Sequence, residues 1–449
     1  MEQPRAASVP LRTDDSLVRV MGTFGLAAAI VNITIGGGIF RLPANVAQSL
    51  GAAAPIAYLV CALAMGLIVL CIADAGSRVS LTGGPYAYVG TAFGPYAGFL
   101  AGVLLWMLGT FAAAAVSTVF ATSVGLLVPA LNGGVMQVVV LVVAFAFWSA
   151  INLRGVGLAA RFNSVATVAK ILPLLLVAIG GAFFVRPEHL QWASTPAAAD
   201  VARTSLLLIF AFAGIEVALV PSGEVRDTAR TVPRAIAVAM IGITALYIAL
   251  QVVAQGVLGP GLATSTASPL ADVARASMGE WARLLLLAGA SISMFGYLGG
   301  MTLSMPRMLF AFARDGFLPK ALASVHPEFR APQTAILTQS IVSLVLAISG
   351  TFERLAILAN VSALALYLGC ALAAWRLRAM AISVPGAGGF RVPFGSVVPW
   401  LACGVIAWLL TGLTGGEWLA FGSCVAVASL LYIATRGPRA LALGSRLEH

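Results

Sequence analysis

The chain has 449 residues, of which 60% are hydrophobic and 9% are charged, and its formal net charge is +10. Soluble domains carry roughly 25% charged residues, so this composition excludes an ordinary soluble globular protein. Apolar runs of about 20 residues recur along the whole chain, which is typical of membrane-spanning helices. The sequence therefore predicts an all-α integral membrane protein in a lipid bilayer, and its scattered basic residues indicate no nucleic-acid partner.

The apolar runs predict twelve transmembrane helices between polar tails at 1–16 and 437–449. The stretch "GGPYAYVGTAFGPYAG" ahead of the third span predicts a short helix at the membrane surface. The predicted spans cover residues 18–49, 52–76, 94–127, 135–152, 160–185, 202–223, 233–258, 283–312, 333–350, 354–376, 396–414 and 417–435.

The basic residues indicate how these spans are oriented. With both termini placed in the cytoplasm, 19 of the 26 Lys and Arg residues fall in inner segments and 6 in outer segments. The remaining one, Lys170, lies within a span. Cytoplasmic segments of membrane proteins carry an excess of Lys and Arg. The sequence thus predicts a multi-pass protein of the cell membrane with both termini cytoplasmic.

Two of the predicted spans are interrupted near their middle. The first contains Gly36, Gly37 and Gly38 in succession, and each glycine costs a helix about 1 kcal/mol relative to alanine. The sixth contains Gly214 followed by Glu216. The two breaks are five spans apart, which suggests two repeats of five spans each. Because five is an odd number, the second repeat is inverted in the membrane relative to the first. The pattern predicts inverted repeats at 17–185 and 200–378, then helices 11 and 12 at 395–436, as in secondary transporters with a midplane site.

A break at membrane depth leaves N–H and C=O groups that protein, water or a ligand must satisfy. The amino end of the second half-helix attracts an anion, whereas the carbonyls that end the first half-helix attract a cation. Close packing of small residues between helices is the alternative explanation. Three successive glycines and a second break favour a ligand that carries both a carboxylate and an ammonium group.

Four stretches resemble signatures of the amino acid–polyamine–organocation superfamily of permeases. They are "IGGGIFRLP" in the first span, "FAFAGIEVALVPSGEVRDTARTVPRAI" in the sixth, and the connections "ADAGSRVSLTGGPYAYVGTAFGPYAGFLAG" and "PRMLFAFARDGFLPKALASVHPEFRAP". The resemblance covers nearly the whole chain. It implies a leucine-transporter-type fold of five plus five inverted helices with helices 1 and 6 broken, followed by two more helices.

The resemblance also implies a substrate site at the two breaks. Backbone amides would bind the substrate carboxylate, and backbone carbonyls would bind its ammonium group. The ring of Phe210 would gate the site, and Met301 would touch the substrate side chain. The amides belong to Gly37, Gly38 and Ile39, the carbonyls to Thr34, Phe210 and Ala213, and Ile35, Ala211 and Gly214 complete the predicted pocket.

The chain departs from the family pattern at two places. Gly37 stands where serine is common, which removes one hydroxyl donor and leaves the carboxylate to the amides. The stretch "VRDTARTVP" stands where the family loop usually carries Asn-Pro, and we expect this to affect loop geometry more than chemistry.

Two membrane-embedded charges are candidates for coupling. A lysine at the centre of a span costs roughly 3 kcal/mol, so Lys170 is expected to face a cavity or partner rather than snorkel to the interface. The resemblance implies that it occupies the position of the cation in sodium-coupled relatives, near Ile35 and Gly36. Glu216 is either a structural carboxylate that holds the second break, or a functional one that carries protons or attracts the substrate ammonium group. Asp74 is expected to pair with Arg78 and stabilise the fold.

These features predict a secondary active transporter of amino acids that works by alternating access without sodium, as a proton symporter or an exchanger. The small and apolar candidate residues favour neutral amino acids, with cationic amino acids or polyamines as the alternative. The alternative from a different functional class is a membrane protein that keeps the binding site and senses amino acids without transporting them. No nucleotide-binding motif, metal-ligand cluster or catalytic triad stands out, so we expect no enzyme, cofactor or metal. The oligomeric state is not predicted.

Overall fold

The computed structural model describes residues 22–79, 85–154, 170–192, 194–214, 228–314, 316–326, 329, 331–381, 392 and 394–444. Within these ranges the chain forms helices and no strand. In the first half they are α1 (Thr23–Thr34), α2 (Gly38–Leu50), α3 (Pro55–Arg78), α4 (Pro85–Phe93), α5 (Pro95–Leu127), α6 (Gly134–Arg154) and the helical segment Lys170–Phe184. In the second half they are α8 (Ala198–Phe212), α10 (Thr228–Leu258), α11 (Pro269–Met278), α12 (Glu280–Arg314), α13 (Gln333–Ser349), α14 (Phe352–Ala379), α15 (Val397–Leu410) and α16 (Gly415–Gly444).

Glycine and proline set several of the helix boundaries. Gly94 has a φ of +93°, which a residue with a side chain rarely adopts, and Pro95 follows at the first position of α5. Proline suits that position because the N–H group that it lacks has no intrahelical partner there. The predicted surface helix therefore forms as α4 and is separated from the long span α5.

Seven helices in the described part of the chain are long and apolar enough to cross a membrane: α3, α5, α6, α10, α12, α14 and α16. Three shorter apolar helices, Lys170–Phe184, α13 and α15, accompany them. The first predicted span is divided into α1 and α2, and the described part of the sixth is α8. The chain is thus a multi-pass membrane protein, while the arrangement of twelve spans in two inverted repeats stays a prediction.

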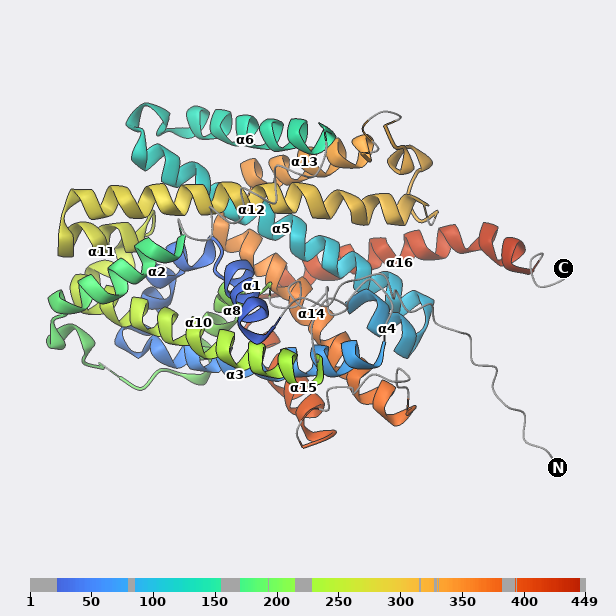
Figure 1. The fold of residues 1–449 in the computed structure, drawn as a ribbon, viewed down its shortest axis with the longest axis horizontal. Helices are drawn as coiled ribbons and strands as arrows, with labels where there is room; N and C mark the ends of the chain where they lie inside the picture. Colours follow the sequence, from blue (N-terminus) through green and yellow to red (C-terminus); the bar gives the residue numbers. More distant parts are fainter. Residues whose placement is uncertain are drawn as a thin grey trace.

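The helix ends at the break lie inside the molecule, whereas the start of α1 is exposed. Helix α1 contacts α10, α2 contacts α8, and α3 contacts both α8 and α10, while α5 contacts α12 and α14. Figure 1 shows α1 and α8 near the middle of the view and α2 towards α11, with α10 on one side of them and α5 and α12 on the other. The long apolar helices therefore surround the segment in which the glycines interrupt the first span.

The two ends of the molecule carry different short helices. Figure 1 shows α11 at one end of the long axis and α4 at the other, joined by the length of α5 and α12. The charge pattern predicts that α4 belongs to an inner connection and α11 to an outer one, and this topology stays a prediction.

A buried ionic cluster joins α3 to α14 near the α4 end. The side chain of Asp74 is fully buried, and its carboxylate accepts hydrogen bonds from Arg78 at 3.2 Å and from Arg378 at 3.1 Å. The pair with Arg78 is as the sequence predicts. Arg378 lies 304 residues further along the chain, and only the fold brings it to Asp74.

Candidate functional site

Helix α1 ends at Thr34, and α2 begins at Gly38, so residues 35–37 are not helical. The backbone N–H of Gly36 donates to the carbonyl of Thr34 at 2.8 Å, and the N–H of Phe40 donates to the carbonyl of Gly37 at 3.3 Å. The amides of Gly38 and Ile39 lie in the first turn of α2, where N–H groups have no intrahelical partner. The break therefore presents amides that an anion can use.

The break is buried, although it contains polar groups. Thr34, Ile35 and Ile39 are each no more than 2% exposed. The hydroxyl oxygen of Thr34 is buried and has no hydrogen-bond partner among the residues that the structure describes. Buried polar groups are nearly always hydrogen-bonded, so this hydroxyl fits a site that binds a polar ligand or water. The sequence predicted a role for the Thr34 carbonyl and overlooked its hydroxyl.

The end of α8 lies directly against the break. A side chain at Gly38 would place its Cβ 3.0 Å from Cδ1 of Phe210 and 3.4 Å from Cα of Ala211. Helix α8 ends at Phe212, and the N–H of Ala213 still donates to the carbonyl of Ile209 at 2.9 Å. Gly214 has a φ of +110°. Two chain segments about 170 residues apart in the sequence thus meet at their helix ends.

Tyr247 of α10 connects the two segments. Its hydroxyl donates to the carbonyl of Ala211 at 3.0 Å and lies 3.5 Å from the carbonyl of Thr34. The side chain is fully buried. Sequence analysis did not single out Tyr247, because a tyrosine within an apolar run gives no sign of which carbonyls it meets.

The other side of the break is apolar. A Cβ at Gly37 would lie 3.1 Å from Cγ1 of Val116 on α5 and 3.3 Å from Sδ of Met294 on α12. A serine at position 37 would therefore be crowded, which gives a packing reason for the glycine. Met301, the residue that the resemblance indicated, lies seven residues beyond Met294, about 10 Å along α12. Its contact with substrate stays a prediction.

Aromatic rings and an ion pair lie next to Phe210. The rings of Phe210 and Phe352 are 5.5 Å apart and meet edge to face. Cζ of Arg41, on α2, lies 5.9 Å from the centroid of the Phe352 ring, and Nη2 of Arg41 lies 3.6 Å from Oε1 of Glu353. This group, which we call the 210–352 cap, links α2, α8 and the start of α14.

The two predicted coupling residues have different outcomes. Lys170 is helical and only 6% exposed, so it is buried in the protein rather than extended to the surface. Its position near Ile35 and Gly36 and its role in coupling stay predictions. Glu216 lies outside the described residues.

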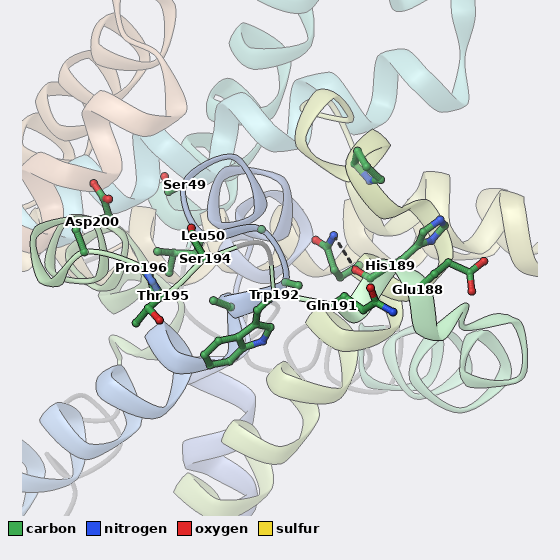
Figure 2. A pocket seen from close by; sticks show the side chains of 16 residues that line it. Ser49, Leu50, Glu188, His189, Gln191, Trp192, Ser194, Thr195, Pro196 and Asp200 are labelled. Carbon is green, nitrogen blue, oxygen red and sulfur yellow. Dashed lines mark hydrogen bonds between the residues drawn. The ribbon is translucent and has the colours of Figure 1, made fainter.

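A separate cavity of about 610 Å³ opens beyond the end of α2. It is lined by residues 49–53, by the connection before α8 and by Gln255, and none of the predicted substrate residues is among its described lining residues. Figure 2 shows Glu188 and His189 on one side of this cavity and Asp200 on the other. The two carboxylates that line this cavity therefore do not converge.

Comparison with known proteins agrees with this architecture. The family model described as "Amino acid permease" matches residues 21–438. The chain is 28% identical over 433 residues to a methylthioribose transporter of Bacillus subtilis, with 93% of each chain covered. It is 27% identical to a branched-chain amino acid permease of the same organism, with 87% of each chain covered.

A further relative is a serine/threonine exchanger of Bacillus subtilis, 26% identical over 361 residues, with 76% of this chain and 79% of the relative covered. The family match extends over nearly the whole chain and includes both helix ends of the candidate site. The permease family match agrees with two features of the structure. Helix α1 ends before Ile35, and α8 ends against this break. The chain belongs to the amino acid permease family of the amino acid–polyamine–organocation superfamily.

Proposed function

We propose that this permease is a sodium-independent transporter of neutral amino acids that binds its substrate at the break between α1 and α2. The observation that carries the proposal is the buried break itself. The N–H groups of Gly38 and Ile39 in the first turn of α2 have no intrahelical partner, and the hydroxyl of Thr34 is buried beside them. A zwitterion matches both helix ends, because the amino end of α2 favours a carboxylate and the carbonyl end of α1 favours an ammonium group.

The surroundings of the break support a neutral substrate. The side chains nearest the Cβ positions of Gly37 and Gly38 belong to Val116, Met294, Phe210 and Leu42, which are all apolar. A cationic substrate would need a carboxylate near its second charge, since an unpaired charge is costly in a low-dielectric site. The names of two relatives, a branched-chain amino acid permease and a serine/threonine exchanger, also favour neutral amino acids.

The proposed transport cycle uses the break in the first span and the predicted break in the sixth. In the proposed mechanism, the substrate bridges the ends of α1, α2 and α8, and the half-helices tilt to expose it to one side of the membrane at a time. The 210–352 cap closes the outer side, which makes Phe210 the gate. Lys170 would occupy the place of a coupling cation and exclude sodium. Substrate transport is then coupled either to protons or to the exchange of a second substrate in the opposite direction.

Uptake by purified protein in liposomes tests the proposal. The panel contains labelled leucine, threonine, lysine, putrescine and methylthioribose. We expect uptake of leucine or threonine, unchanged when choline replaces sodium and increased by an inward proton gradient or by unlabelled amino acid inside. Strict sodium dependence would contradict the role of Lys170, and uptake of lysine or putrescine alone would contradict the neutral substrate.

Substrate binding without any flux would instead indicate a sensor. Equilibrium binding of the same labelled amino acids to the detergent-solubilised protein, measured beside uptake, separates these two outcomes.

A further inference from the structure

A buried glutamine on α10 contacts the half-helix that carries the proposed substrate amides. Gln251 is fully buried, although the span around it is apolar. Its Nε2 donates to the carbonyl of Pro43, in the first half of α2, at 3.4 Å. Its Oε1 accepts from the hydroxyl of Tyr58 on α3 at 3.0 Å. Both polar ends of this amide are therefore used, and one chain of hydrogen bonds joins three helices.

Tyr58 and Pro43 together determine which way the Gln251 amide faces. The carbonyl of Pro43 can only accept, so it needs the NH2 group of the amide. The hydroxyl of Tyr58, which is also fully buried, then donates to the amide oxygen. The ring of Tyr58 meets the ring of Tyr247 edge to face, with their centroids 6.4 Å apart. Tyr58 thus belongs to the same packed group as the residue that connects α1 and α8.

The contact at Pro43 falls on a weakened turn of α2. Pro43 lies inside this helix and has no N–H, so the carbonyl of Ile39 lacks the donor that an α-helix normally supplies. This turn follows directly on Gly38 and the non-helical residues 35–37. The amides of Gly38 and Ile39 therefore lie in a segment that its own backbone restrains poorly. A side chain that binds at Pro43 restrains this segment from outside.

The other polar side-chain contacts that join described residues of α2 to neighbouring elements are more exposed. Gln48 donates to the carbonyl of Ala263 at 2.7 Å, and its side chain is exposed. Arg41 and Glu353 form the partly exposed ion pair of the 210–352 cap. Polar contacts are stronger where water is excluded, so the bond from Gln251 is the contact best placed to fix α2.

One face of α10 sets α2 against α8. Tyr247 and Gln251 are four residues apart on this helix, so they lie one above the other on the same face. Tyr247 donates to the carbonyl of Ala211 near the end of α8, and Gln251 donates to the carbonyl of Pro43 on α2. The two half-helices at the proposed substrate site are therefore fixed to one helix.

We infer that Gln251 is a positioning residue for the substrate. It holds the first turns of α2 so that the amides of Gly38 and Ile39 face the substrate carboxylate, and Tyr58 orients its amide. The inference rests on the proposed function, because it takes the break as the substrate site. Gln251 acts through α2 and not on the substrate itself.

Hydrogen–deuterium exchange of the purified full-length protein measures how firmly α2 is held, without any substrate. In Gln251→Leu we expect the amides of α2 to exchange about tenfold faster, as the loss of one buried hydrogen bond implies. Gln339→Leu is the matched control, and its α2 should exchange as in wild type. Gln339 is 2% exposed, and its amide bonds to Trp106, Thr110 and Ser343 on α5 and α13.

Equilibrium binding of labelled leucine and threonine shows whether this restraint serves the substrate. We expect Gln251→Leu to bind about tenfold more weakly and Gln339→Leu to bind as wild type does. Gln251→Glu is the conservative variant, because a neutral carboxyl group supplies the same acceptor and donor as the amide. Its affinity at pH 5 should stay within about threefold of wild type at the same pH.

Wild-type exchange of α2 in Gln251→Leu would overturn the inference, and so would faster exchange with unchanged substrate affinity. No recovery in Gln251→Glu would assign the loss to packing and overturn the role of the hydrogen bond. Failure of the proposed function gives a different result, since wild type would then bind neither amino acid, whereas faster exchange in Gln251→Leu would still support the hold on α2. Thermal unfolding of each variant in detergent shows that it is folded.

Discussion

At the scale of single residues, Gly38 lies where a side chain would fill the proposed approach of a substrate to the amides of α2. The space where its side chain would lie ends at the Phe210 ring and the backbone of Ala211. We predict that Gly38→Leu reduces substrate affinity at least about tenfold, because the side chain fills the approach to the amides. Equilibrium binding of labelled leucine or threonine measures this effect.

The control for this variant is Gly242→Leu on α10, where a Cβ would meet nothing within 4 Å. It is expected to insert and bind as wild type does. Unchanged affinity in Gly38→Leu would mean that the substrate carboxylate binds elsewhere.

Lys170 is the second residue at which a single change is informative. It is buried in an apolar helix, where a charge is retained only at a cost of roughly 3 kcal/mol. We predict that Lys170→Met lowers the initial rate of uptake at least about tenfold, a change of about 1.4 kcal/mol, while the protein still inserts.

Lys320→Met is the matched control, since Lys320 lies on the surface after α12 and is exposed. Its uptake is expected to equal that of wild type. Wild-type uptake in Lys170→Met would assign Lys170 to the structure rather than to coupling.

At the scale of elements, the 210–352 cap links three helices that must separate if the outer side opens. The Arg41–Glu353 ion pair is partly exposed, and such pairs contribute about 0.2–1 kcal/mol. We predict that Glu353→Gln shifts the protein towards the outward-open state by up to about fivefold. A Thr34→Cys reporter in a cysteine-free background would then react faster with a membrane-impermeant thiol reagent added outside.

Glu280→Gln is the control for the cap, because Glu280 pairs with Arg275 and Arg283 at the start of α12 and not with α2. In Glu280→Gln, the Thr34→Cys reporter should react with the thiol reagent at the same rate as in the protein that carries the reporter alone. An equal rate in Glu353→Gln would show that the ion pair does not hold the outer side closed.

The cluster around Asp74 fastens α3 to α14 in a different way, because its carboxylate is fully buried. Removing one partner of a buried ion pair leaves uncompensated charge and costs about 3–5 kcal/mol. We predict that Asp74→Ala, which leaves Arg78 and Arg378 without this carboxylate, lowers the free energy of unfolding by about 3 kcal/mol.

Chemical denaturation in detergent micelles measures the loss in Asp74→Ala. The control Glu280→Ala breaks exposed pairs and should cost less than about 1 kcal/mol. Equal stability of the two variants would contradict a structural role for Asp74.

At the scale of the whole molecule, the predicted topology places the two ends of α12 on opposite sides of the membrane. The helix has 35 residues, about 52 Å, which exceeds the roughly 30 Å hydrocarbon core. We predict that Glu280→Cys in intact cells reacts with a membrane-impermeant thiol reagent, whereas Lys320→Cys reacts only after the cells are opened. The reverse pattern would invert the predicted topology.

Sequence alone determined the membrane class, the approximate positions of the helices and the place where the first one is interrupted. These features depend on local properties, namely apolar length, the helix-breaking effect of three glycines and the boundaries set by proline and glycine. The pairing of Asp74 with Arg78 belongs here too, because residues four apart on a helix are neighbours. The match of the family model to residues 21–438 confirms the resemblance that these motifs suggested.

Only the tertiary structure decided which residues surround the break. Val116, Met294 and Tyr247 come from three different helices, and nothing in their local sequence distinguishes them from other apolar positions. Arg378 at Asp74 and Glu353 at Arg41 are likewise contacts across some 300 residues of chain. The physical reason is that an apolar membrane helix presents similar side chains on every face, so its neighbours are chosen by packing in three dimensions and not by the pattern along the chain.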